Sequence, residues 1–130
     1  MNKPLRVEDT EVLDPQRFGA YGKSLNFRSY LRERLYIRRK MKSDLSGKSL
    51  DYGFDMHEAL FQRRWLPKKH QWVLMCEYNV LLLRRDEHIP SPPTRTESYQ
   101  ILCKIYTQAV IDEWVESLPF KVPPDLPWKT

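Results

Sequence analysis

The longest helical pattern in the first half of the chain begins at Asn26 and continues to about Lys42. Four apolar residues recur at intervals that place them on one face of a helix: Phe27, Tyr30, Ile37 and Met41. Asn26 is a residue type that caps helix N-termini by accepting a backbone hydrogen bond. The residues on nearly the opposite face are basic: Arg28, Arg32, Arg39 and Lys42. The pattern therefore predicts a helix with an apolar side and a basic side.

The middle of the chain predicts a loop followed by two further helices. Residues 43–53 are rich in turn-forming types. Asp55 and Glu58 have the spacing of a capping box, which predicts a short helix over 56–65. Residues 70–85 are rich in Leu and poor in β-branched types, so a largely buried helix is favoured over a strand there.

Prolines divide the C-terminal part of the chain. The segment 89–93 contains three prolines and predicts a stiff connector that is not helical. Thr94 and Glu97 form a second capping-box pattern, and apolar residues at helical spacing follow it, so we expect the best helix of the chain over 95–118. The tail, residues 119–130, carries four prolines and predicts an extended polyproline conformation.

These elements predict one domain with a mainly α fold, in which three to four helices over 24–118 form a small core. Residues 1–23 show no lasting hydrophobic period and contain prolines and glycines, which predicts an extended N-terminal arm. Terminal arms of this composition gain order when another molecule holds them. We therefore expect the N-terminal arm and the proline-rich tail to lie along neighbouring proteins.

Charge is distributed unevenly along the chain. The net charge is +5, yet 15 basic and only 6 acidic residues lie between Lys23 and Arg85, and both flanking parts are mildly acidic. This distribution predicts one concentrated basic surface. Such a surface suits phosphate, an anionic membrane face or an acidic protein.

Two clusters of basic residues are candidates for that surface. The first lies on the predicted helix at 26–42, and five of its members are expected to contact a partner: Arg28, Arg32, Arg38, Arg39 and Lys42. The second lies around Trp65 and Trp72 and consists of Arg63, Arg64, Lys68, Lys69 and His70. The planar guanidinium of arginine suits bidentate contacts with phosphate or carboxylate. The alternatives are a merely solvated helix face for the first cluster and core-packed tryptophans in the second.

The tail offers apolar candidates for partner binding. Phe120, Leu126 and Trp128 lie between prolines on a segment too short to build a core of its own. Bulky apolar side chains of this kind serve as anchors in the pockets of a partner. We therefore expect these three residues to hold the C-terminal arm on a neighbouring protein.

The sequence predicts neither catalysis nor a cofactor, and it offers no site for a small-molecule substrate. His57, His70 and His88 are scattered, with His57 on a predicted helix, and no metal-ligand spacing or phosphate-binding glycine loop is present. Cys76 and Cys103 lie in apolar segments and are expected to be buried free thiols. The chain shows neither a membrane-spanning run nor the apolar stretch of a secretory signal, so we expect a protein that is not secreted and has no transmembrane segment.

These observations favour a non-catalytic accessory subunit of a large multiprotein assembly, which docks its arms and its basic helix on neighbouring subunits. The arginine-rich amphipathic helix favours a mitochondrial rather than a cytoplasmic location. There, a peripheral inner-membrane subunit of a respiratory-chain or ATP synthase complex is expected, with anionic lipid headgroups as a further candidate partner. The alternative is an RNA-binding component of a mitochondrial ribosome, whose basic surface contacts rRNA. A third possibility is an adaptor that binds an acidic client transiently.

Overall fold

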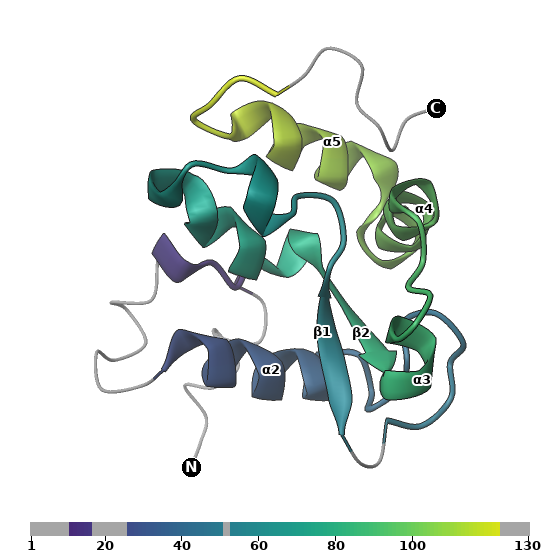
Figure 1. Cartoon of the computed structure of the whole chain (residues 1–130). Helices are drawn as coiled ribbons and strands as arrows, with labels where there is room; N and C mark the ends of the chain where they lie inside the picture. The colour runs from purple at the N-terminus through teal and green to yellow at the C-terminus, as the bar shows by residue number, and fades with distance from the viewer. Residues whose placement is uncertain (1–10, 17–25, 51–52, 123–130) are drawn as a thin grey trace.

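The computed structural model of the chain describes residues 11–16, 26–50 and 53–122. A two-stranded antiparallel sheet, β1–β2, lies at its centre (Figure 1). Helices cover both faces of this sheet, so the molecule has three layers. The elements in chain order are α2 (Phe27–Arg38), β1 (Phe54–Glu58), the 3₁₀ helices η2 (Arg63–Trp65), η3 (Lys68–Met75) and η4 (Glu77–Asn79), β2 (Val80–Arg84), α3 (Arg85–His88), α4 (Arg95–Tyr106) and α5 (Gln108–Ser117).

Both faces of the sheet are buried. Because successive side chains of a strand point to opposite faces, Met56 and Leu82 pack in the cluster with α2, whereas Leu81 and Leu83 pack in the cluster with α4 and α5. All four residues of the run Val80–Leu83 are fully buried. A strand that is covered on both faces has a continuous apolar sequence and not the alternation that marks a half-buried strand.

The helix predicted over 70–85 is wrong for that reason. Its first part forms the 3₁₀ helices η3 and η4, and its last part forms the strand β2. A short continuous apolar run fits a buried helix and a buried strand equally well, so periodicity could not separate the two. The pairing of β2 with β1 decides the conformation.

The short helix predicted over 56–65 is also wrong, because β1 takes its first residues and the 3₁₀ turn η2 its last. Asp55 does not cap a helix. Its carboxylate lies 2.9 Å from Nδ1 of His88 and accepts a hydrogen bond from Arg85 at 3.3 Å. These partners lie 30 or more positions along the chain, where local sequence spacing gives no information.

The predicted helix caps at Asn26 and Thr94 are confirmed. The side chain of Asn26 accepts a hydrogen bond from the Ser29 amide, and α2 begins at the next residue. The Thr94 side chain accepts from the Glu97 amide while the Glu97 carboxylate accepts from the Thr94 amide, which completes the capping box. The connector before Thr94 is not helical, as predicted.

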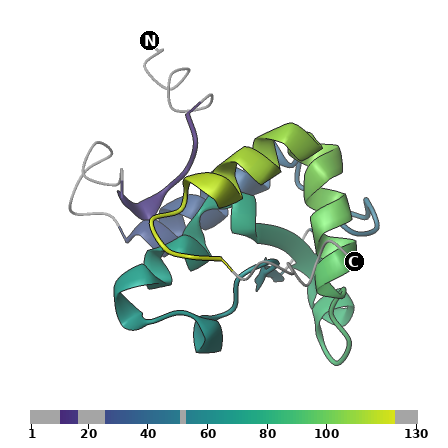
Figure 2. The same ribbon diagram turned by 90° about the horizontal axis from the view of Figure 1, so that it is seen from above.

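The helix predicted over 95–118 forms, but it is divided at Thr107. This residue has a φ of 99°, and its side chain accepts a hydrogen bond from the Val110 amide to cap α5. Figure 2 shows that α4 and α5 run in different directions. The break lets Leu102 of α4 and Ile111 of α5 join the same buried cluster. Neither glycine nor proline marks the break in the sequence, so the pattern predicted one helix.

The buried face of α2 is rotated from the predicted one. Leu31 and Leu35, four residues apart, are fully buried, and Phe27 packs against the same cluster. Ile37 and Met41, which were predicted on the apolar face, are 53% and 52% exposed. The helical segment itself is confirmed, ending at Arg38 rather than near Lys42.

The mainly helical fold is confirmed in this coarse form, with a small sheet added. Of the predicted N-terminal arm, the structure describes residues 11–16, which lie beside α2 (Figure 1). Leu13 is fully buried there, and its carbonyl accepts a hydrogen bond from the Glu77 amide at 2.9 Å. This part of the arm belongs to the packed body of the protein. Residues 1–10 and 17–23 of the predicted N-terminal arm and residues 123–130 of the predicted tail lie outside the described residues.

Candidate functional site

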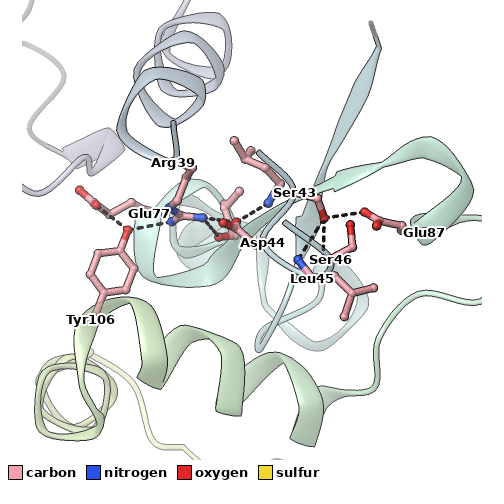
Figure 3. A network of polar contacts seen from close by, with 10 residues as sticks. Arg39, Ser43, Asp44, Leu45, Ser46, Glu77, Glu87 and Tyr106 are labelled. Carbon is pink, nitrogen blue, oxygen red and sulfur yellow. Dashed lines mark hydrogen bonds and ion pairs between the residues drawn. The ribbon is translucent and has the colours of Figure 1, made fainter. Parts of the chain in front are cut away.

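Arg39, predicted to contact a partner, is buried inside the protein. Its side chain is only 5% exposed and forms an ion pair with Asp44 (Figure 3). The guanidinium also donates hydrogen bonds to the Val80 carbonyl at 3.3 Å and the Tyr106 hydroxyl at 2.8 Å. A charge at this depth is stable only when it is paired and hydrogen-bonded. The structure therefore corrects this prediction: Arg39 joins the end of α2 to β2 and α4.

Glu77 extends the same network. This carboxylate is buried and accepts hydrogen bonds from the Tyr106 hydroxyl at 2.7 Å, from Arg38 at 3.0 Å and from the Leu13 amide. Burial raises the pKa of Tyr106, and the charge of Glu77 raises it further against the opposing effect of Arg39, so the phenol stays protonated and donates to the carboxylate. Arg38 thus has an internal partner as well.

The other three members of the first basic cluster lie in different surroundings. Arg32 lies with its guanidinium 3.7 Å from the centre of the Phe54 ring, a cation–π contact. Arg28 is exposed and reaches the sulfur of Met75 at 3.5 Å. Lys42 is exposed on the loop that follows α2. The structure does not bring these five predicted residues onto one surface.

The second basic cluster remains at the surface. Arg63, Arg64, Lys68 and Lys69 are all exposed. Arg63 pairs with Glu58 at 3.5 Å, but in the part of the chain that the structure describes no carboxylate pairs with the other three. Trp65 is 40% exposed, so the core-packing alternative is wrong for this residue. Trp72 is partly buried and packs against the core cluster, as that alternative predicted.

Arg95 completes this surface from the start of α4. Its guanidinium stacks over the Trp65 ring at 3.6 Å. Burial lowers the pKa of Arg95, and the nearby charge of Arg64 lowers it further, which shows that two cations lie close together. We call the following residues the basic surface: Arg63, Arg64, Trp65, Lys68, Lys69 and Arg95. No local sequence pattern indicated Arg95, because it lies 30 positions from Trp65.

Two histidines that were predicted to be scattered lie together. His57 is on β1 and not on a helix, and its ring centre lies 5.1 Å from that of His88 on α3. His88 is oriented by Asp55 at 2.9 Å. Burial lowers the pKa of His57 to about 4, with smaller effects of His88 and Arg95, so His57 carries no charge at neutral pH.

A cleft of about 540 Å³ opens beside the two histidines. Its walls come from α2, from β1 and the segment after it, and from α3 and the proline connector. The charged and imidazole side chains that line it are Arg28, His57, Glu58, Arg63, Arg64 and His88. The cleft therefore borders the basic surface and shares Arg63 and Arg64 with it. Of the residues at the cleft, the sequence grouped only Arg63 and Arg64, as members of the second basic cluster. The other lining residues are distant in sequence and come together only in the folded chain.

The described residues contain no group of three or more His, Cys, Asp or Glu that could hold a metal ion. Among them, Cys76 and Cys103 are free thiols; Cys76 is buried, whereas Cys103 is half-buried. No helix in the described ranges is long and apolar enough to cross a bilayer.

The described part of the tail packs on its own chain. Phe120 is half-buried, and its ring lies 5.9 Å from that of Phe61 and 4.7 Å from that of His70, measured between centroids. Phe120 therefore packs against aromatic rings of its own chain. The other two predicted anchors, Leu126 and Trp128, lie outside the described residues.

Comparisons of the chain with models of protein families, with characterised proteins and with solved structures found no match.

Proposed function

We propose that the protein is a non-catalytic component of a larger assembly and that it binds its partner through the basic surface. One observation carries this proposal. Arg38 and Arg39 are neutralised inside the fold, whereas Arg64, Lys68 and Lys69 have no carboxylate partner among the described residues. Exposed cations beside an exposed aromatic ring are suited to an anionic partner.

The setting that we favour is an accessory subunit of a mitochondrial respiratory-chain or ATP synthase complex, at the periphery of the inner membrane. The net charge of +5 and its concentration in the middle of the chain support it, since a neighbouring subunit with an acidic surface would neutralise the basic surface. Leu126 and Trp128 of the tail would add apolar contacts to the same neighbour.

The second candidate is an RNA-binding component of a mitochondrial ribosome, and the stacked pair of Trp65 and Arg95 favours it. Exposed tryptophan and arginine side chains are the groups on which unpaired bases stack, and flanking lysines contact phosphates. Lys68 and Lys69 stand in such flanking positions after Trp65.

Native purification of the tagged full chain tests the proposal. We expect one set of partners to be recovered in stoichiometric amount. Nuclease treatment separates the two candidates, because digestion of RNA removes the partner of an RNA-binding component and leaves a contact with an acidic protein subunit in place. Recovery of the chain alone, or turnover of a small compound by it, would contradict a role as an assembly component.

A further inference from the structure

The cleft carries more positive charge than its own carboxylates neutralise. Glu58 is engaged by Arg63, through both its side chain at 3.5 Å and its amide at 3.3 Å. Asp55, beside the cleft, is shared by two groups of α3. Within the described ranges no carboxylate pairs with Arg28 or Arg64. These two cations approach the cleft from separate segments of the chain, 36 positions apart.

Two further guanidiniums lie near these groups without lining the cleft: that of Arg32, four residues after Arg28 on α2, and that of Arg85, which pairs with Asp55. Burial lowers the pKa of Arg32, and the charges of Arg28 and Arg85 lower it further against the opposing effect of Asp55. Like charges held this close repel one another, and an anion placed among them relieves the repulsion. His57 adds a neutral imidazole that can donate or accept a hydrogen bond.

We propose that the cleft binds the phosphate group of a small phosphorylated compound, with Arg28 and Arg64 as its main cationic contacts. A phosphate monoester carries up to two negative charges and three acceptor oxygens, whereas a carboxylate carries one charge and two oxygens. Guanidinium groups match phosphate oxygens in bidentate fashion. The volume of about 540 Å³ is in the range of small-molecule sites, roughly 300–1,000 Å³, and leaves room for more than the phosphate itself.

This inference goes beyond the proposed function, because it assigns a small ligand to the cleft while the basic surface faces a macromolecule. The two can be separated experimentally. Lys68 and Lys69 belong to the basic surface and do not line the cleft, whereas Arg28 lines the cleft and is not part of the basic surface.

The test uses the full chain, titrated with inorganic phosphate in a calorimeter and, in parallel, in thermal unfolding. We expect saturable binding and a rise in the unfolding midpoint with phosphate concentration. Arg28→Gln and Arg64→Gln should each weaken phosphate binding by roughly tenfold or more, because each removes a charge-assisted contact. Lys104→Gln, an exposed residue of α4 outside the cleft, removes the same charge and should leave the affinity unchanged. Both arginines are exposed, so circular dichroism should show the wild-type fold.

Three results would overturn the proposal. The first is the absence of saturable phosphate binding, and the second is equal binding by the Arg28, Arg64 and Lys104 variants. The third is binding only to vesicles that contain phosphatidic acid, or only to a single-stranded RNA, with none to inorganic phosphate, since the cleft would then recognise a lipid or a polynucleotide. Vesicles of phosphatidylcholine alone serve as the reference.

Discussion

Replacing Asp44 by alanine should lower the free energy of unfolding by about 3 to 5 kcal/mol, because it leaves the buried cation of Arg39 without its counter-charge. The side chains of Asp44 and Arg39 are each only 5% exposed. The Asp44 carboxylate also accepts a hydrogen bond from the Leu82 amide of β2 at 2.7 Å. In the alanine variant this amide would lose its partner. Chemical denaturation followed by circular dichroism measures the change.

Asp86→Ala provides the control for this prediction. Its side chain is 77% exposed and lies 3.6 Å from that of Arg84, so its removal should change stability by less than about 1 kcal/mol. Replacing Arg39 by methionine in the Asp44→Ala background should recover part of the loss, since it removes the unpaired charge. Equal stability of the Asp44→Ala and Asp86→Ala variants would show that the network does not hold the fold.

Asn79→Ala should lower the free energy of unfolding by about 3 kcal/mol or more. The Asn79 side chain is fully buried, and its oxygen accepts hydrogen bonds from the amides of Leu60 and Phe61 at 2.9 and 2.7 Å. Its nitrogen donates to the carbonyls of Phe61 and Leu74 at 3.0 and 3.4 Å. Alanine leaves these backbone groups unsatisfied in the core, at about 1 to 3 kcal/mol for each one that water cannot reach.

The matched control for Asn79 is Asn26→Ala, which removes an exposed helix cap and should cost only about 1 kcal/mol. Both variants lose the same amide group and differ in burial. Thermal or chemical unfolding of the two, compared with the wild type, measures the difference. If Asn79→Ala is no more destabilising than Asn26→Ala, then water enters the site and the segment after β1 is not fixed as the structure shows.

The sequence predicted those parts of the fold that depend on neighbours in the chain. The caps at Asn26 and Thr94 were found because their partners lie three residues away. The sheet was missed because the pairing of Met56 with Leu82 joins residues that are distant in sequence. The break at Thr107 was missed because packing of α4 and α5 on the sheet, and no local residue type, sets it.

The sequence predicted only part of the candidate site, namely the basic cluster around Trp65. A run of basic residues in a sequence does not reveal which of them have internal partners, and Arg39 finds its partners only after α2, β2 and α4 pack together. The basic residues around Trp65 are exposed, and among the described residues Glu58 is the carboxylate that pairs with them. Arg95 and the cleft depend on the tertiary arrangement and have no local sequence signal.

The proposed function separates two roles of basic residues in one small protein. Arg39 stabilises the fold and should affect partner binding only by unfolding the chain. Lys68 and Lys69 are exposed and unpaired in the described structure, so they should affect binding without a change in stability.

The most direct measurement is the amount of partner recovered with the tagged full chain when Lys68 and Lys69 are both replaced by glutamate. Lys104→Glu, equally exposed but outside the basic surface, is the control. We predict that the double variant unfolds at the wild-type temperature within a few degrees and loses its partner, whereas the control retains it. Full recovery of the partner by the folded double variant would show that the basic surface is not where the protein binds.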